Sequence, residues 1–144
     1  MSWIAASLIL QAILLVYLQL HEWVPLFPWN DLSPGNPQQR LDVVLGLVQV
    51  AVLVGFALPW LPVMAVGLAL YGGWLALQII DWWKPYLFGT SERRRRAYQK
   101  YFGRTYRFLP AIADHPVPDA AHVILQTLLA GVCASGAVAF VQRL

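Results

Sequence analysis

The sequence is poor in charge and nearly free of cysteine, and both shortages narrow the class of protein. Charged residues make up 12% of the 144 residues, and hydrophobic residues make up 59%. A soluble domain carries about 25% charged and about 45–50% apolar residues, so this balance argues against an ordinary soluble domain and indicates a membrane protein. The only cysteine, Cys133, lies in an apolar stretch, which excludes an intrachain disulfide bond.

Motifs that would assign an activity are also missing. The sequence has no CxxC or HExxH pattern, no phosphate-binding glycine loop and no hydrolase nucleophile elbow. The first twenty residues contain no Lys or Arg and end without a small-residue cleavage site. We therefore interpret them as a retained membrane helix and not as a secretory signal.

Long apolar runs, in contrast, are abundant. Four stretches approach or exceed the roughly 20 apolar residues that cross about 30 Å of hydrocarbon. They cover approximately residues 2–20, 41–58, 62–83 and 119–141. The second and third are joined by the short sequence PWLP, whose prolines end one helix and begin the next. The sequence predicts an all-α integral membrane four-helix bundle, with residues 1–144 forming a single transmembrane domain.

The two long connections between these spans differ in charge. Loop A, residues 21–40, is rich in proline and aromatic residues, and we expect it to fold back over the mouth of the bundle. Loop B, residues 84–118, carries eight of the ten Lys and Arg residues. Because basic loops stay on the cytoplasmic side, we predict a protein of the cell (inner) membrane with both loops cytoplasmic and both termini outside.

Loop B contains a basic segment with the signals of a helix. Thr90 or Ser91 can cap a helix that begins at Glu92, and Gly103 can end it. This pattern predicts a short amphipathic interfacial helix on the inner leaflet, between the third and fourth spans, with anionic lipids as partners. No nucleic-acid partner is expected. The candidate head-group residues are Arg93, Arg94, Arg95, Arg96, Lys100, Arg104 and Arg107.

Ionisable residues gather at the predicted cytoplasmic ends of the spans, one acid for each span with two histidines at the same level. This polar mouth comprises His21, Glu22, Asp42, Asp81, Asp119 and His122. Asp42 and Asp119 suit the positive ends of helix dipoles, and ion pairs with the basic loop would explain the other residues of the mouth. A divalent metal is a second interpretation, because Asp119 and His122 have the i, i+3 spacing of di-iron bundles. A proton-linked cluster is a third.

Each span also contains one well-immersed glutamine. These are Gln11, Gln49, Gln78 and Gln126. An amide in hydrocarbon needs a partner, so we predict that they hydrogen-bond to one another inside the bundle, with a polar ligand site or path as the alternative. Small residues four apart, such as Ala69 and Gly73, predict close helix contact within the monomer or between protomers.

Three classes of function remain open. The preferred prediction is a small inner-membrane protein that binds an anionic lipid, a lipid-like ligand or a membrane partner through the basic loop and polar mouth. The first alternative is a metal-dependent or acid–base membrane enzyme that acts on a lipid head group. The second is a proton- or ion-linked transporter that uses the glutamines. The expected partners are membrane lipids, with a homo-oligomer or another membrane protein as further candidates.

Overall fold

The computed structural model describes residues 2–35 and 39–144, and the regular secondary structure of these residues is helical, with no strand. The long helices are α1 (Trp3–Trp23), α2 (Gln39–Ala57), α3 (Leu61–Gln78) and α6 (Ala120–Val141). A π-helical turn η1 (Ile79–Trp83) and α4 (Lys84–Phe88) continue α3, and α5 (Glu92–Phe102) follows. Four of the described helical segments are long and apolar enough to cross a membrane, which confirms the all-α prediction and the four apolar spans.

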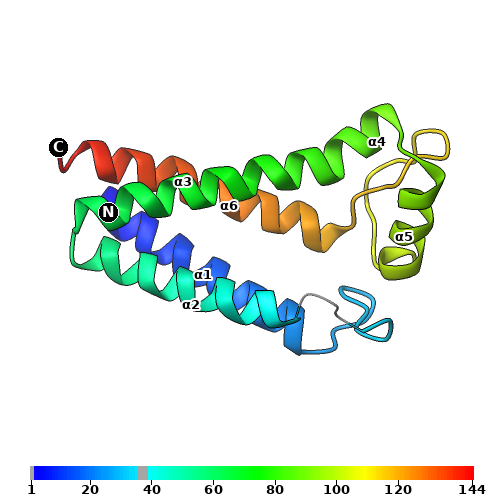
Figure 1. Ribbon diagram of the computed structural model, residues 1–144, viewed down its shortest axis with the longest axis horizontal. Coiled ribbons are helices and arrows are strands. Elements are labelled where there is room, and N and C mark those ends of the chain that lie inside the picture. The colour runs from blue at the N-terminus through cyan, green and yellow to red at the C-terminus, as the bar shows by residue number, and fades with distance from the viewer. Residues whose placement is uncertain (1, 36–38) are drawn as a thin grey trace.

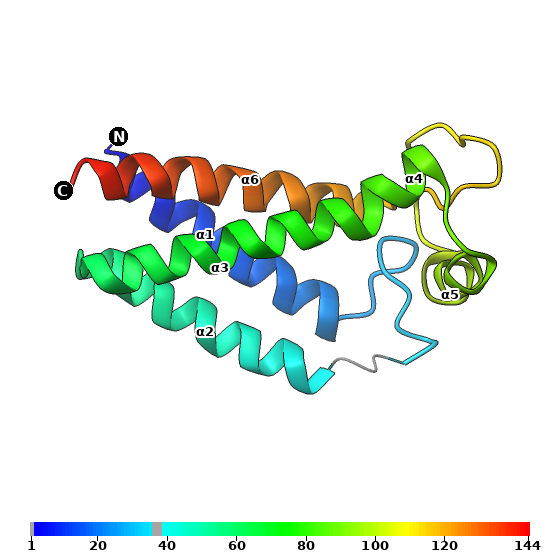
Figure 2. The same ribbon diagram turned by 45° about the horizontal axis from the view of Figure 1, so that its top comes forward.

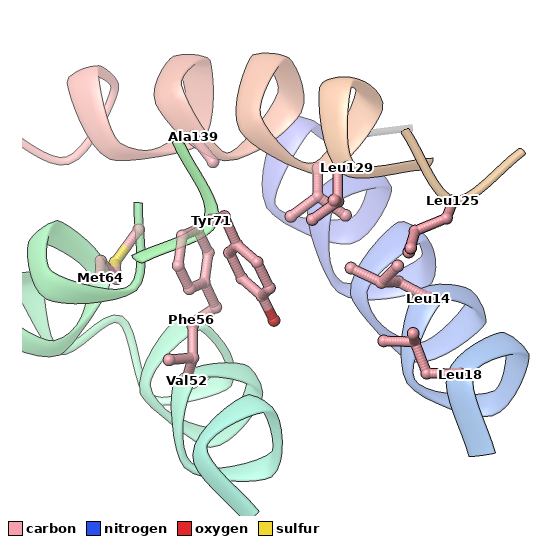
Figure 3. Packing of buried hydrophobic residues seen from close by; sticks show 10 residues of the cluster. Leu14, Leu18, Val52, Phe56, Met64, Tyr71, Leu125, Leu129 and Ala139 are labelled. Atoms are coloured by element: carbon pink, nitrogen blue, oxygen red, sulfur yellow. The ribbon is translucent and has the colours of Figure 1, made fainter. Parts of the chain in front are cut away.

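Each of the four long helices packs against two of the others. Helix α1 packs against α2 and α6, and α3 packs against the same two helices. Both ends of the described chain and the α2–α3 turn lie at one end, whereas the described part of loop A, loop B and α5 lie at the other (Figures 1 and 2). Each long helix contributes a large, fully buried side chain to the core (Figure 3), namely Leu14, Phe56, Met64 and Leu129.

Several helix ends follow local sequence signals. Asp119 caps α6 by accepting a hydrogen bond from the backbone N–H of His122, directly after Pro118. Ser91 caps α5 by accepting from the N–H of Arg94, and α5 ends at Gly103 as predicted. An oxygen-bearing side chain at the N-cap satisfies one of the N–H groups that lack a partner in the first helical turn.

The third helical segment continues beyond residue 83, where the predicted membrane span ends. The continuous helical segment Leu61–Phe88 has 28 residues, or about 42 Å at 1.5 Å per residue. Pro85 cannot donate to the carbonyl of Asp81, four residues earlier. That carbonyl instead accepts hydrogen bonds from the hydroxyl of Tyr98 and from the guanidinium of Arg94. The helical segment therefore continues past the proline with this carbonyl still hydrogen-bonded.

The small residues that pack helices together are only in part the predicted ones. Ser135 and Ala139 of α6 are buried, whereas Ala69 and Gly73 of α3 are exposed. Close approach of α3 to α2 uses Gly67 instead, where an added methyl group would overlap Cγ1 of the buried Val52. The small-residue row of α3 therefore makes no close contact within the monomer.

This difference gives a matched test on one helix. Gly67→Ala is expected to destabilise the protein by about 1–3 kcal/mol, because the stiff Val52 side chain or the helices themselves must shift. Gly73→Ala meets no atom within 4 Å and is expected to be neutral or stabilising by about 0.5–1 kcal/mol, because alanine favours the helix. Thermal unfolding in detergent micelles measures both. Equal effects of the two variants would contradict the observed α2–α3 packing.

Candidate functional site

Loop A is held in place by one buried asparagine. Asn30 is 3% exposed and donates from Nδ2 to the carbonyls of His21 (2.6 Å) and Val24 (2.8 Å). Its Oδ1 accepts from the backbone N–H of Leu26 at 2.6 Å. These bonds satisfy carbonyls at the end of α1 and hold residues 21–30 in a compact turn. Tyr106 of loop B then donates its backbone N–H to the Pro28 carbonyl at 2.8 Å, which joins the two loops.

A cavity of about 280 Å³ lies at this end of the molecule, and we call it the loop cavity. It is bounded by the last turn of α1, loop A, the first turn of α2, the end of α5 and the start of α6. Its polar and aromatic lining residues are His21, Glu22, Asn30, Asp31, Asp42, Tyr101, Phe102, Thr105, Asp119 and His122. Five of the six residues of the predicted polar mouth are therefore brought together around one cavity.

The most buried polar group of the loop cavity is the Asp119 carboxylate, which is 1% exposed. Its Oδ1 accepts from the backbone N–H of His122 at 3.0 Å and bonds the Nδ1 of the same ring at 2.7 Å. Its Oδ2 accepts from the Thr105 hydroxyl at 2.8 Å. Because a carboxylate only accepts, Nδ1 of His122 carries a proton, and in the neutral ring Nε2 has a lone pair.

These bonds decide the charge state of Asp119. Burial alone raises the pKa of a carboxyl group, but the bonds and charge of His122 and the Thr105 hydroxyl outweigh burial, so the pKa of Asp119 is lowered from 3.8. The carboxylate is therefore ionised at neutral pH. Its contribution to stability is present above the ordinary carboxyl pKa and is lost as the pH falls through the lowered pKa.

Aromatic rings fix the position of the His122 side chain. Trp82 of η1 lies over it, with ring centroids 3.9 Å apart and planes tilted by 31°. Phe102 of α5 and His21 of α1 meet it edge-on at 5.0 Å and 5.8 Å. The imidazole is therefore enclosed by three helices, with Asp119 as its hydrogen-bond partner.

Three of these supporting residues, Trp82, Phe102 and Thr105, were not among the predicted site residues. Trp82 lies in the aromatic-rich sequence DWWKPY, and tryptophan and tyrosine are typical of any membrane interface. Thr105 follows Gly103, and nothing in its local sequence indicates a buried carboxylate as its partner. Trp82, Phe102 and Thr105 reach the site through contacts between elements that are distant in sequence. The sequence pointed to this site only through the polar character of Asp119 and His122, which these residues contact.

The sixth residue of the predicted mouth, Asp81, does not line the loop cavity. It lies within the extended third helix and forms an ion pair with Arg94 of α5. Burial opposes the charge on Arg94, but the bond to Asp81 outweighs it, and the pKa of Arg94 is raised. Asp81 thus holds α5 against the end of the third helix.

Most of the basic residues of loop B also have partners within the protein. Arg95 pairs with Asp114, Arg96 with Glu92, and Arg104 with Asp31 at 3.5 Å. Arg107 donates to the Phe102 carbonyl at 2.6 Å, near the end of α5. Lys100 lies 5.0 Å from the ring centre of Tyr101, and Arg93 is exposed. The paired arginines organise loop B, and they are partly exposed at its surface.

The donor atoms around the loop cavity do not form a metal site among the described residues. No group of three or more His, Cys, Asp or Glu side chains in this part of the chain is arranged to hold a metal ion. Both oxygens of Asp119 already accept hydrogen bonds, and Nδ1 of His122 is bonded to one of them. This geometry gives the divalent-metal interpretation no support.

The glutamines behave as a bonded pair and two separate residues. Gln126 donates to Gln78 at 3.5 Å and accepts from the indole N–H of Trp83 at 2.7 Å, which links α6 to the third helix. Gln11 donates to Ser7 of its own helix at 3.0 Å. The Oε1 atoms of Gln11 and Gln49 are buried and have no partner among the described residues. The predicted bonding between helices is therefore observed for Gln78 and Gln126.

No protein-family model, no curated protein and no solved structure matches this chain. The roles of the residues around the loop cavity therefore rest on their geometry and chemistry.

Proposed function

We propose that the protein is an integral membrane protein that binds a lipid-like ligand, with a positively charged head group of that ligand held in the loop cavity. The observation that carries this proposal is the charge of the lining. Glu22, Asp31, Asp42 and Asp119 supply carboxylates, and the described lining residues include no Lys or Arg. An ammonium group is attracted by carboxylates and by aromatic faces such as those of Tyr101 and Phe102.

The same lining disfavours an anionic head group inside the cavity. Arg104 lies beside Asp31 and His21 beside Glu22, but apart from the two histidines every formally charged side chain of the described lining is acidic. Burying a phosphate that carries no ammonium group next to these carboxylates would cost more free energy than leaving it in water. We therefore assign contact with anionic lipid to the outer surface of α5 and not to the cavity.

The position of α5 supports a membrane setting for the site. Helix α5 lies across the loop ends of the long helices and not along them (Figures 1 and 2). If the long helices cross the membrane, α5 is parallel to its surface, where its exposed Arg93, Arg96 and Lys100 meet anionic lipids. The excess of Lys and Arg in loop B favours the cytoplasmic side of the cell membrane for this end, with both termini outside.

Binding is tested by neutralising the cavity without changing its shape. A short-chain phosphatidylethanolamine is expected to raise the unfolding temperature in micelles, because a ligand stabilises the state that binds it. Glu22→Gln with Asp42→Asn is expected to weaken the affinity at least about tenfold, the equivalent of about 1.4 kcal/mol. Glu92→Gln removes an exposed acid outside the cavity and is expected to leave the affinity unchanged.

Two results would contradict the proposal. Phosphatidylglycerol, which has no ammonium group, would stabilise the protein as much as phosphatidylethanolamine. Alternatively, the double variant would bind phosphatidylethanolamine as well as the Glu92→Gln control. Either result would mean that the carboxylates of the cavity do not select the head group.

A second candidate function is an acid–base reaction on the bound head group, and His122 is the observation that favours it. Its Nδ1 is fixed by a buried carboxylate, which leaves Nε2 to accept a proton from water or from a ligand hydroxyl. His122→Gln keeps a side chain of similar length without a titratable ring. Release of a head-group product by the wild type and not by this variant, with ligand binding retained by both, would favour the enzyme.

A further inference from the structure

A second cavity, of about 290 Å³, lies between α5 and the segment of loop B that follows it. We call it the arginine pocket, and its charged and polar lining includes Arg95, Arg96, Gln99, Arg107, Asp114 and His115. Phe102 lines both this pocket and the loop cavity, so the two cavities are neighbours. Their charges are opposite in sign.

Three guanidinium groups face one carboxylate in the arginine pocket. Arg95 forms an ion pair with Asp114 inside the lining, and Arg96 pairs with the exposed Glu92 on its own helix. Pairing of exposed side chains is weak and exchanges readily with other partners. The described lining therefore keeps an excess of positive charge, and its guanidinium groups present several N–H donors each.

Arg107 adds an independent sign of a missing acceptor. Its terminal nitrogen donates to the Phe102 carbonyl at 2.6 Å, but its Nε is buried and has no partner among the described residues. Buried donors are nearly always satisfied by a protein group, water or a ligand. The Nε and a terminal nitrogen of a guanidinium form a planar fork, which matches two oxygens of a phosphate.

The far wall of the arginine pocket is anchored to α4. Nδ1 of His115 bonds to the carbonyl of Tyr86 at 2.8 Å, and the Tyr86 hydroxyl donates to the Pro110 carbonyl at 2.9 Å. These two bonds hold loop B opposite α5 at a fixed separation. A pocket with preset walls loses less entropy when it binds a ligand than one that must first form.

We propose that the arginine pocket binds a phosphate group, carried either by a lipid head group or by a soluble phosphate compound. The proposal does not depend on the ligand of the loop cavity, because the two cavities share Phe102 and no charged residue. At the level of α5, a lipid phosphate and a soluble phosphate both reach the pocket. The chemistry they share is a doubly hydrogen-bonded oxyanion between Arg96 and Arg107.

The test uses the full-length protein in maltoside micelles, which contain no phosphate. Calorimetric titration with inorganic phosphate forms one arm, and titration with short-chain phosphatidic acid forms the other. In the inorganic-phosphate arm, Arg96→Gln is expected to weaken binding at least about tenfold, whereas Arg93→Gln changes it less than about twofold. Arg93 is the matched control because it is exposed on the same helix and does not line the pocket.

The Arg107→Lys variant distinguishes a specific phosphate site from general attraction of phosphate to a basic surface. It keeps the charge but removes the fork, so it is also expected to weaken binding about tenfold. Circular dichroism of each variant verifies that α5 is retained.

Several outcomes decide between the sources and test the site itself. If phosphatidic acid binds more tightly than inorganic phosphate, and inorganic phosphate displaces it, the natural ligand is a lipid. If inorganic phosphate binds and phosphatidic acid does not, the natural ligand is a soluble phosphate compound. No binding by the wild type in either arm would overturn the proposal. Equal weakening of inorganic-phosphate binding by Arg93→Gln and Arg96→Gln, with Arg107→Lys unchanged, would also overturn it. The Glu22→Gln and Asp42→Asn double variant is expected to bind phosphate like the wild type, so failure of one site does not imply failure of the other.

Discussion

Asp119→Ala is expected to lower the free energy of unfolding by about 3–5 kcal/mol, which is the usual cost of removing one partner of a buried charged pair. The variant loses the bonds that Asp119 makes to Thr105 and to the His122 ring, together with the N-cap of α6. Those groups remain in a site where Asp119 is 1% exposed, so water replaces the lost bonds poorly. Chemical unfolding in micelles, followed by circular dichroism, measures the change.

The matched control is Asp114→Ala, the same chemical change in an ion pair at the surface. The Asp114 side chain is 74% exposed beside Arg95, so its loss is expected to cost at most about 1 kcal/mol. The wild type should also lose stability on acidification as Asp119 becomes protonated at its lowered pKa, and Asp119→Ala should lose less. Similar unfolding free energies for the two variants would show that the Asp119 network does not hold the loops.

Trp82→Ala has the second large expected effect, again about 3–5 kcal/mol, because it empties a buried indole site in a tightly packed region. Trp82 is 5% exposed and contacts the rings of His122, Tyr98 and Phe102. Its removal eliminates the ring that packs over the His122 imidazole. The loop cavity should therefore lose affinity for phosphatidylethanolamine together with the loss of stability.

Trp60→Ala is the control for this change. Trp60 lies at the opposite end of the molecule, in the α2–α3 turn, and is 60% exposed. Its replacement is expected to change the unfolding free energy by less than about 1 kcal/mol in micelles. If Trp82→Ala unfolded at the same denaturant concentration as Trp60→Ala, the aromatic support of His122 would be unimportant to the fold.

The long helices were predictable because each depends on signals that are local in sequence. The apolar runs, the Asp119 cap after Pro118 and the Ser91 cap of α5 all act within a few residues of one another. The continuation of the third helix past Pro85 was not predictable on the same basis. It depends on hydrogen bonds that the Asp81 carbonyl accepts from Tyr98 and Arg94. These residues lie 17 and 13 positions further along the chain.

The candidate site divides in the same way. Placing the acids and histidines at helix ends was sufficient to bring five of them together, because neighbouring helix ends lie at the same level. The role of Asp81 depended on which face of α5 packs beside it, which sequence spacing alone did not specify. Likewise, a run of arginines looks the same in sequence whether its charges meet lipid or pair with Asp114 and Asp31.

Native mass spectrometry of the protein, extracted gently from its own membrane, tests the central claim most directly. The loop cavity is expected to retain one amine-bearing lipid for each chain in the wild type and in Glu92→Gln. The same added mass should be absent from the Glu22→Gln and Asp42→Asn double variant. A bare wild-type chain, or an added mass retained equally by all three proteins, would contradict the assignment of a cationic head group to this cavity.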